Sequence, residues 1–233
     1  MKKFALTSMF VSVFGFVLLS VLPGLTAVAK ADTTYQAFDL SGATDSFNGA
    51  LGNYFNVNKP IEVTELGVFD NGVLNNLGST GFQVAIYDSS GSLVSGSLQT
   101  IKSSATQSGN YGFVTLTTPL TLNPANGYSI AAAGYWTTNK AANTNPSFGS
   151  TGTTSDGGGL ISIETKPSLT GWYHQNQTTL GSSVGSVTQT TWYYGGATFS
   201  YKADPVPEPA TILLVGVGLL GLAAVSRKKT HNK

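Results

Sequence analysis

Apolar and aromatic residues occur in short runs along residues 32–204, and clusters of Gly, Asn, Asp, Ser and Pro separate these runs. This pattern is typical of β-strands joined by turns. Phe82–Tyr87 and Ala197–Tyr201 alternate so that every second side chain shares one face, which predicts strands with a buried face. In Ile61–Val68 the alternation slips at Glu65, and a β-bulge at that point explains the slip.

The same pattern predicts the remaining elements. Further strands are expected at Tyr35–Leu40, Asn53–Val57, Ser92–Ile101, Tyr111–Thr117, Tyr128–Ala132 and Leu160–Glu164. No convincing helical period occurs in residues 32–204, so we predict an all-β domain, a single jelly-roll-like β-sandwich. Two polar stretches, 139–159 and 175–189, have little to bury and are predicted to be long loops. Loops at the ends of a sandwich often carry its binding surface.

The N-terminus follows a different pattern. Lys2 and Lys3 precede an almost wholly apolar stretch from Phe4 to Leu22, and Ala29-Lys30-Ala31 then supplies small residues at a cleavage position. These features predict a signal peptide over residues 1–31, removed by signal peptidase after Ala31 or, as the alternative, after Ala29. The folded domain is then expected over residues 32–204.

The C-terminus has three parts in a fixed order. Pro207-Glu208-Pro209 comes first, sixteen uncharged residues follow at 210–225, and Arg227-Lys228-Lys229 comes last. As a helix, the uncharged stretch would span ~24 Å, which is shorter than the ~30 Å hydrocarbon core of a membrane. The basic residues would stay on the cytoplasmic side, so the domain would lie outside the inner membrane.

This arrangement resembles the PEP-CTERM sorting signal. The resemblance rests on Val206–Thr211, the Gly-rich apolar stretch and the basic end, and it covers only residues 205–233. It implies processing near the Pro-Glu-Pro by an exosortase, in a Gram-negative bacterium that makes exopolysaccharide. It also implies transient anchoring of the C-terminal helix in the inner membrane, followed by delivery to the cell surface or the extracellular matrix.

Charge and cysteine content narrow the possible functions. Charged residues make up 10% of the chain, and residues 32–204 contain ten acidic and five basic side chains. A domain with a net charge of about −5 lacks the basic surface that nucleic acids require, so no nucleic-acid partner is predicted. The chain has no cysteine, which excludes disulfides and thiolate metal sites. The domain must therefore be stabilised by its core alone.

Aromatic pairs are the most unusual feature of the domain. All three tryptophans lie beside a tyrosine, at Tyr135-Trp136, Trp172-Tyr173 and Trp192-Tyr193-Tyr194. Adjacent residues on a strand face opposite sides, so one ring of a pair can fill the core while the other stacks on a sugar ring. This pattern makes Trp136, Trp172, Tyr173, Trp192 and Tyr194 candidate glycan-binding residues. The simpler interpretation, that the rings only close the ends of the sandwich, is favoured for any single pair.

Motifs for catalysis are weak. Gly181–Gly185 matches G-x-S-x-G, but no histidine follows it before the predicted tag, and the only histidine of the domain, His174, precedes it. The carboxylates do not cluster. Glu62 and Glu65 lie on one strand and face opposite sides unless the bulge intervenes, so a glycosidase pair stays open as an alternative.

Metal binding is equally weak in the sequence. Asp70-Asn71-Gly72 and Asp156 offer oxygen ligands of the kind that calcium prefers. An Asx turn explains the first group equally well. We predict no catalytic residue and no cofactor, with calcium as the alternative.

These observations predict an exported, surface-sorted, non-enzymatic protein. Its expected role is structural, adhesive or glycan-binding in the extracellular polysaccharide matrix. One alternative is a carbohydrate-active enzyme that acts on this matrix. Another is a self-assembling surface protein whose sheet edges pair between copies. The sequence leaves open the glycan, the oligomeric state, the processing site near Pro-Glu-Pro and whether the processed product is released or attached to lipid.

Overall fold

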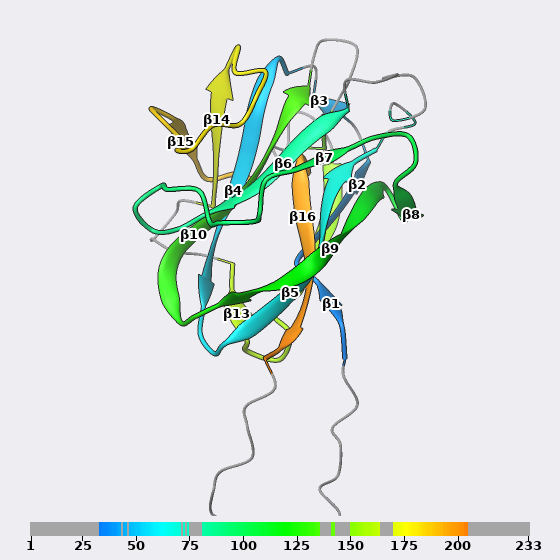
Figure 1. Ribbon diagram of the computed structural model, residues 1–233. Helices are drawn as coiled ribbons and strands as arrows, with labels where there is room; N and C mark the ends of the chain where they lie inside the picture. The colour runs from blue at the N-terminus through cyan, green and yellow to red at the C-terminus, as the bar shows by residue number, and fades with distance from the viewer. Residues whose placement is uncertain are drawn as a thin grey trace, which may run out of the picture. The chain divides into compact units, whose positions relative to one another are not determined.

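The computed structural model describes residues 33–42, 44–45, 47–70, 72, 74, 81–135, 141–142, 150–163 and 170–204 (Figure 1). The predicted signal peptide, with Ala29 and Ala31, lies outside these residues, as do Trp136 and the predicted sorting segment from residue 205 onwards. The described part contains β-strands and no α-helix, which confirms the all-β prediction. Within it, no helix has the length and apolar character needed to span a membrane.

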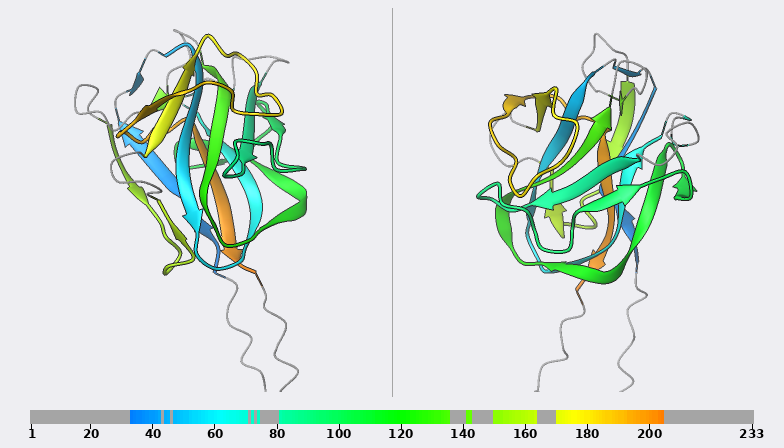
Figure 2. Two further views of the ribbon diagram at one scale, coloured as in Figure 1. Left: turned by 90° about the vertical axis from the view of Figure 1, so that its left-hand side faces the viewer. Right: turned by 45° about the horizontal axis from the view of Figure 1, so that its top comes forward.

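Two antiparallel sheets form most of the structure (Figures 1 and 2). The first, here called the β5 sheet, has the order β1 (Tyr35–Gln36), β16 (Ala197–Ala203), β5 (Ile61–Phe69), β9 (Tyr111–Leu122) and β8 (Thr106–Ser108). The second, the β4 sheet, has the order β15 (Thr188–Thr190), β14 (Gly171–Gln175), β4 (Gly49–Val57), β10 (Ala125–Tyr135), β6 (Phe82–Tyr87) and β7 (Gln99–Ile101), with β13 (Ile161–Ser162) also paired to β4.

Two short strand pairs complete the described structure. One joins β2 (Phe38–Gly42) to β12 (Ser150–Thr154), and the other joins β3 (Thr44–Asp45) to β11 (Ala141–Ala142). The first and last strands of the described chain pair with each other, because Tyr35 of β1 lies opposite Tyr201 of β16. The described chain therefore begins and ends at the same end of the β5 sheet (Figure 1).

A single apolar cluster fills the space between the two large sheets. Phe55 of β4 and Phe199 of β16 are fully buried, and their ring centroids are 4.8 Å apart. Phe82, Val84 and Ile86 of β6 enter the same cluster, as their alternation predicts. Contact between side chains of both sheets makes this cluster the main core, and its apolar burial is the largest favourable contribution to folding. The finer jelly-roll assignment stays a prediction.

The predicted bulge in β5 is present at Thr64. Glu65 lies opposite Ser200 of β16 and Val63 lies opposite Tyr201, so Thr64 is an extra residue on β5. On the other side of β5 the register against β9 also shifts, between Thr115 and Leu120. Pro119 lies within that irregular stretch and has no amide hydrogen to donate to a neighbouring strand.

The predicted strand Tyr35–Leu40 is divided between two sheets. It breaks at Ala37, so β1 pairs with β16 and β2 pairs with β12. The backbone amide of Ala37 donates to the carbonyl of Phe199, at 3.0 Å. The amide of Phe38 donates to the hydroxyl of Thr198, at 3.1 Å. A side chain distant in sequence thus replaces a ladder bond, and no local pattern indicates the break.

The predicted strand Ser92–Ile101 is also too long, because only Gln99–Ile101 forms β7. The hydroxyl of Ser97 accepts the amide of Ile86 at 3.1 Å and lies within hydrogen-bond distance of the carbonyls of Val94 and Ile86, at 2.7 and 3.0 Å. The amide of Ile86 therefore bonds to a side chain in place of a neighbouring strand, while its carbonyl accepts the amide of Val94 at 2.9 Å. The predicted loop 139–159 is likewise incorrect at 150–154, where β12 pairs with β2. The predicted strand at 160–164 shortens to β13.

A second apolar cluster covers the outer face of the β4 sheet, which faces away from the main core. It contains Ala50 of β4, Ala85 of β6, Ala131 and Ala133 of β10 and the fully buried Trp172 of β14. The indole of Trp172 lies against Gly52, where a Cβ atom would come within 2.3 Å of Trp172 Cε2. Small residues on β4, β6 and β10 therefore make room for the large ring of Trp172 on β14, the strand that pairs with β4.

Gly52→Ala is expected to destabilise the fold by about 1–3 kcal/mol, because the added methyl overlaps a ring that is packed on all sides. Urea denaturation measures the loss. Gly181→Ala is the matched control, since the nearest atom to its added Cβ is 3.9 Å away, and it is expected to change stability by less than about 0.5 kcal/mol. Equal stability of the two variants would contradict close packing of Trp172 on Gly52.

Candidate functional site

Residues 176–187, here called the flap, connect β14 to β15 and fold over the outer face of the β4 sheet. In the left view of Figure 2 the flap lies in front of this sheet and β16 lies behind it. Leu180 and Val184 of the flap are buried in the outer cluster. The predicted loop over 175–189 is thus a loop through most of its length. It packs along a sheet face instead of standing at an end of the sandwich.

Hydrogen bonds attach the flap to the sheet at two places. At the first, the Tyr87 hydroxyl donates to the carbonyl of Gly181 at 3.1 Å. There the amide of Leu180 also donates to Oε1 of Gln83, at 2.7 Å. At the second, the amide of Leu93 donates to the carbonyl of Ser182 at 2.9 Å, and the amide of Val184 donates to the carbonyl of Gly91 at 3.0 Å. The flap is therefore held by backbone and side-chain bonds as well as by apolar contact.

The structure of the flap also tests whether the G-x-S-x-G match at residues 181–185 is a nucleophile motif. Ser183 of the flap forms an isolated antiparallel bridge with Ser92, which lies in the segment between β6 and β7. A nucleophile elbow requires a strand, a sharp turn and a helix in that order. The flap has no such arrangement, so this motif gives no support to a serine hydrolase.

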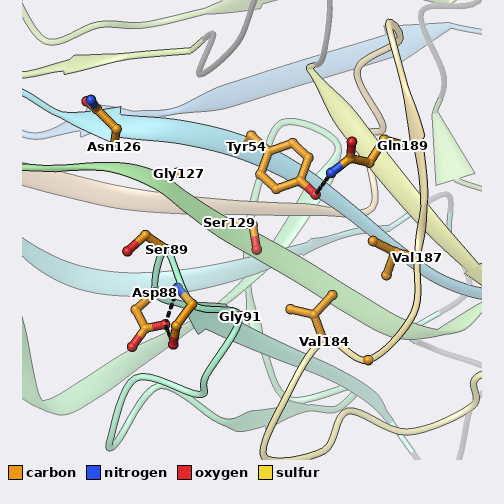
Figure 3. A pocket seen from close by; sticks show the side chains of 12 residues that line it. Tyr54, Asp88, Ser89, Gly91, Asn126, Gly127, Ser129, Val184, Val187 and Gln189 are labelled. Carbon is orange, nitrogen blue, oxygen red and sulfur yellow. Dashed lines mark hydrogen bonds between the residues drawn. The ribbon is translucent and has the colours of Figure 1, made fainter.

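A pocket of about 370 Å³ lies between the flap, the turn after β6 and the start of β10 (Figure 3). The turn after β6 contributes Asp88, the irregular start of β10 contributes Asn126, and the flap contributes Val184. Tyr54 and Ser129 form part of its floor, because β4 and β10 pair with these two residues opposite each other. Long-range strand pairing thus brings together residues that are far apart in the sequence.

Tyr54 and Gln189 form one side of the pocket. Gln189 Nε2 donates to the Tyr54 hydroxyl at 3.1 Å, and Figure 3 shows the two side chains pointing toward each other. Partial burial raises the pKa of Tyr54, and the bond from Gln189 opposes part of this effect. Tyr54 is consequently neutral at physiological pH, with its ring held at the pocket by a side chain from β15.

Asp88 forms the opposite side. Its Oδ1 atom accepts the amide of Ser90 at 2.9 Å, the hydroxyl of Ser90 at 2.6 Å and the amide of Ser92 at 3.0 Å. The Ser90 hydroxyl and then the Ser92 amide are the main causes that lower the pKa of Asp88. The carboxylate is therefore ionised at neutral pH and fixed in orientation by its own turn.

Polar side chains without a charge complete the lining. Asn126 is exposed in the irregular start of β10, and Asn56 holds this segment in place because its Oδ1 accepts the amide of Gly127 at 3.0 Å. Figure 3 shows the hydroxyl of Ser129 pointing toward the pocket. Amide groups both donate and accept hydrogen bonds, and so do hydroxyls. Together with one aromatic ring and one carboxylate, these groups suit a polyhydroxylated ligand.

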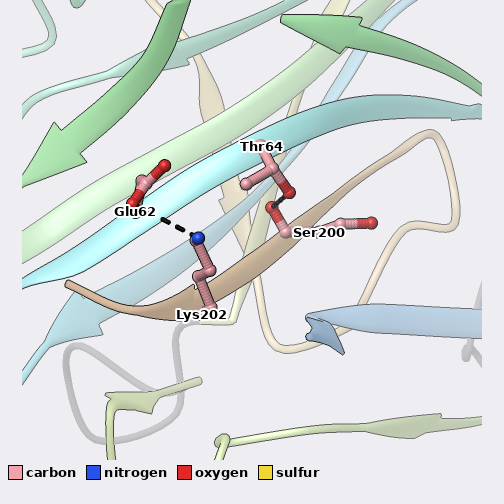
Figure 4. Close-up of polar contacts among 4 residues, drawn as sticks. All are labelled: Glu62, Thr64, Ser200 and Lys202. Carbon is pink, nitrogen blue, oxygen red and sulfur yellow. Dashed lines mark hydrogen bonds and ion pairs between the residues drawn. The ribbon is translucent and has the colours of Figure 1, made fainter. Parts of the chain in front are cut away.

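The carboxylates considered for glycoside hydrolysis lie in the other sheet. The bulge at Thr64 leaves both Glu62 and Glu65 partly exposed on β5. Glu62 pairs with Lys202 at 3.6 Å (Figure 4), and Glu65 accepts the hydroxyl of Thr115 at 3.3 Å. Asp88 is the one carboxylate among the described residues that line the pocket, whereas a glycosidase uses two carboxyl groups.

The candidate aromatic residues that the structure describes do not line this pocket. Trp172 is fully buried and Tyr194 is 6% exposed, so neither has the open ring face that stacking on a sugar needs. The outer cluster covers Trp172, and Tyr194 packs against the main core. Tyr173 and Trp192 are partly buried. The ring of Tyr173 lies 5.5 Å from that of Phe47. Trp136 lies outside the described residues.

Sequence reasoning missed Tyr54, Asp88, Asn126 and Gln189 as site residues. In the sequence, Asp88–Gly91 and Asn123–Gly127 have only the composition of turns. The missing information is the register of β10, which places Ser129 between Tyr54 of β4 and Tyr87 of β6. A single sequence does not contain that register.

Turn chemistry accounts for the carboxylates that were considered for calcium. Asp70 Oδ1 accepts the amide of Leu74 at 3.0 Å, and Asp156 Oδ1 accepts the amide of Gly158 at 2.9 Å. Across the described ranges, no three His, Cys, Asp or Glu residues gather in a group that could hold a metal ion. The pocket is therefore the strongest candidate site in this part of the chain.

Comparison with known proteins identifies the C-terminal segment. The family model for the PEP-CTERM protein-sorting motif matches residues 205–228. The match includes Pro207-Glu208-Pro209, the uncharged stretch 210–225 and the first basic residues, Arg227 and Lys228. This motif implies export, transient membrane-anchored sorting with exosortase processing, and delivery to the cell surface. No curated protein matches the sequence.

Tyr87→Phe is expected to loosen the flap, because it leaves the carbonyl of Gly181 without its donor and costs about 0.5–1.5 kcal/mol. Hydrogen exchange at the amides of Leu180 and Val184 should become faster. Tyr128→Phe is the control, since its hydroxyl bonds to the carbonyl of Asn123 in an exposed turn. Unchanged exchange in Tyr87→Phe, or equal acceleration in both variants, would contradict the assigned role of this bond.

Alkaline pH is expected to destabilise the domain partly through Tyr87. Burial raises the pKa of its hydroxyl from 10.0 to about 12. Above about pH 10 the unfolded chain loses this proton and the folded chain keeps it, so the contribution is complete below that pH and disappears toward about pH 12. Urea denaturation across this range should show the stability advantage of the wild type over Tyr87→Phe becoming smaller. An advantage that does not change with pH would show that Tyr87 is not protected from ionisation.

Proposed function

We propose that this chain, which is exported and sorted to the cell surface through its PEP-CTERM motif, is a non-enzymatic glycan-binding protein of the extracellular polysaccharide matrix, with a structural or adhesive role. The observation that carries the proposal is the pocket formed by Tyr54, Asp88, Asn126, Ser129 and Gln189. Its groups are those that recognise a sugar: amides, hydroxyls, one carboxylate and one aromatic ring.

The chemistry of the lining supports this proposal. A sugar presents many hydroxyls, and each both donates and accepts hydrogen bonds. Gln189 and Asn126 offer amides, Ser129 offers a hydroxyl, and Asp88 offers a charged acceptor. Val184 and Val187 add apolar surface beside these polar groups. A site that mixes a few oriented polar groups with apolar walls matches the usual composition of small-ligand pockets.

The rigidity of the lining supports it as well. Tyr54 and Ser129 stand on paired strands of a sheet that packs on both faces. The Asp88 turn is closed by three hydrogen bonds to one carboxylate oxygen. Groups already held in position lose little conformational entropy when a ligand binds, which increases affinity for a given set of contacts.

The enzymatic alternative requires a second carboxylate across the scissile bond, about 5–9.5 Å from the first. Asp88 has no such neighbour among the residues that line the pocket. Its pKa is lowered, whereas a general acid needs a raised one. These features favour binding over hydrolysis.

Tyr54→Ala is expected to weaken glycan binding about tenfold or more, because it removes the aromatic wall of the pocket and the partner of Gln189. Native affinity gels that contain a panel of polysaccharides, including the matrix polymer of the host, measure the change. Trp192→Ala is the matched control, since it removes a partly buried aromatic ring that does not line the pocket.

Loss of retardation in Trp192→Ala with full retardation in Tyr54→Ala would move the binding surface to the tryptophan. Absence of retardation of the wild type by every polymer would reject the glycan-binding role. Urea denaturation of both variants confirms that each is folded before the gels are interpreted.

A further inference from the structure

We infer that the pocket selects sugars by charge: it accepts an uncharged or an amino sugar and rejects a sugar that carries a carboxylate, with Asp88 as the residue that sets this preference. The inference rests on the proposed function, because it names the ligand class of the same site. Two independent features of the lining carry it. One is the sign of the charge in the lining. The other is that several backbone amides of the lining already donate hydrogen bonds to acceptors within the protein.

The charge in the pocket lining is negative. Among the described residues that line it, Asp88 alone carries a formal charge at neutral pH, and these residues include no Lys, Arg or His. A carboxylate on a ligand would therefore meet a like charge and no opposite one. Two like charges within a few ångströms repel each other, and the repulsion grows as the site loses water. An ammonium group would be attracted by the same field.

Three glycine or turn amides of the lining are already used within the protein. Proteins also bind anions with unpaired backbone N–H groups of turns. Here the amide of Gly91 donates to the carbonyl of Asp88 at 2.9 Å, and that of Val184 donates to the carbonyl of Gly91 at 3.0 Å. The amide of Gly127 donates to Oδ1 of Asn56. These three amides are therefore not free to hold a bound anion.

The carboxylate of Asp88 is well placed to act as an acceptor. Its Oδ1 atom receives all of the hydrogen bonds that the described residues donate to this side chain. The other oxygen, Oδ2, has no partner among the described residues and is available to a ligand hydroxyl or ammonium. The bonds to Oδ1 also lower the pKa of Asp88, so the negative charge persists in mildly acid conditions.

The test compares polymers that differ only in charge. The full chain, purified in a mild detergent, is run in affinity gels that contain pullulan, soluble cellulose or galactomannan. Each polymer is paired with a derivative whose primary hydroxyls have been oxidised to carboxylates, and chitosan serves as the amino polymer. At low ionic strength, the wild type is expected to bind a neutral polymer about tenfold more tightly than its oxidised derivative.

Asp88→Asn is the decisive variant. It keeps Oδ1 as the acceptor for Ser90 and Ser92 and removes the charge. The preference for the neutral polymer over its oxidised derivative is expected to fall about tenfold, because the repulsion of the ligand carboxylate is lost, whereas the loss of the charged acceptor weakens the binding of both polymers alike. Asp156→Asn is the matched control, because Asp156 closes a similar turn through Gly158 and does not line the pocket. It should leave the preference unchanged.

The outcomes separate this inference from the proposed function. Equal binding of neutral and oxidised polymers by the wild type, or an unchanged preference in Asp88→Asn, would overturn the charge selection and leave glycan binding intact. Failure of every neutral polymer and of chitosan to bind would overturn the proposed function and, with it, the inference.

Discussion

The indole of Trp172 packed on Gly52 is the contact on which the outer half of this structure depends. Only a residue without a Cβ leaves room for the ring at this position on β4. The indole N–H has no hydrogen-bond partner among the described residues, which costs about 1–3 kcal/mol. Burial of so large an apolar surface offsets that cost. The ring then supplies an apolar platform with Ala50, Ala85 and Ala131, and the flap packs over it.

Local signals in the sequence were sufficient for the regular strands. The alternation in Phe82–Tyr87 and the phase slip at Glu65 correspond to β6 and to the bulge at Thr64. These local signals failed where a side chain from outside the strand replaces a backbone partner, as the hydroxyl of Ser97 does for the amide of Ile86. Alternation also says which residues share a face and not whether that face is covered. Trp172 was a candidate for an open ring face for this reason, and the flap covers the face on which it lies.

The candidate site illustrates the same limit. Asp88–Gly91 and Asn123–Gly127 have the composition of turns in the sequence, yet nothing local relates Asp88 to Tyr54. Pairing of β10 with both β4 and β6 relates them, because Ser129 lies opposite Tyr54 on one side and Tyr87 on the other. The flap then adds Val184, and β15, which follows the flap, adds Gln189. The site is thus a product of sheet register and loop docking, and neither leaves a motif in the sequence.

The sorting motif and the candidate pocket lie in separate parts of the chain. The described chain begins at β1 and ends at β16, which are neighbours in the β5 sheet. The pocket is built on the β4 sheet, from described residues between Tyr54 and Gln189. The PEP-CTERM motif begins at residue 205, beyond all of them. The processing near Pro207-Glu208-Pro209 that this motif implies would therefore remove none of these side chains, so the processed and the unprocessed chain would present the same lining.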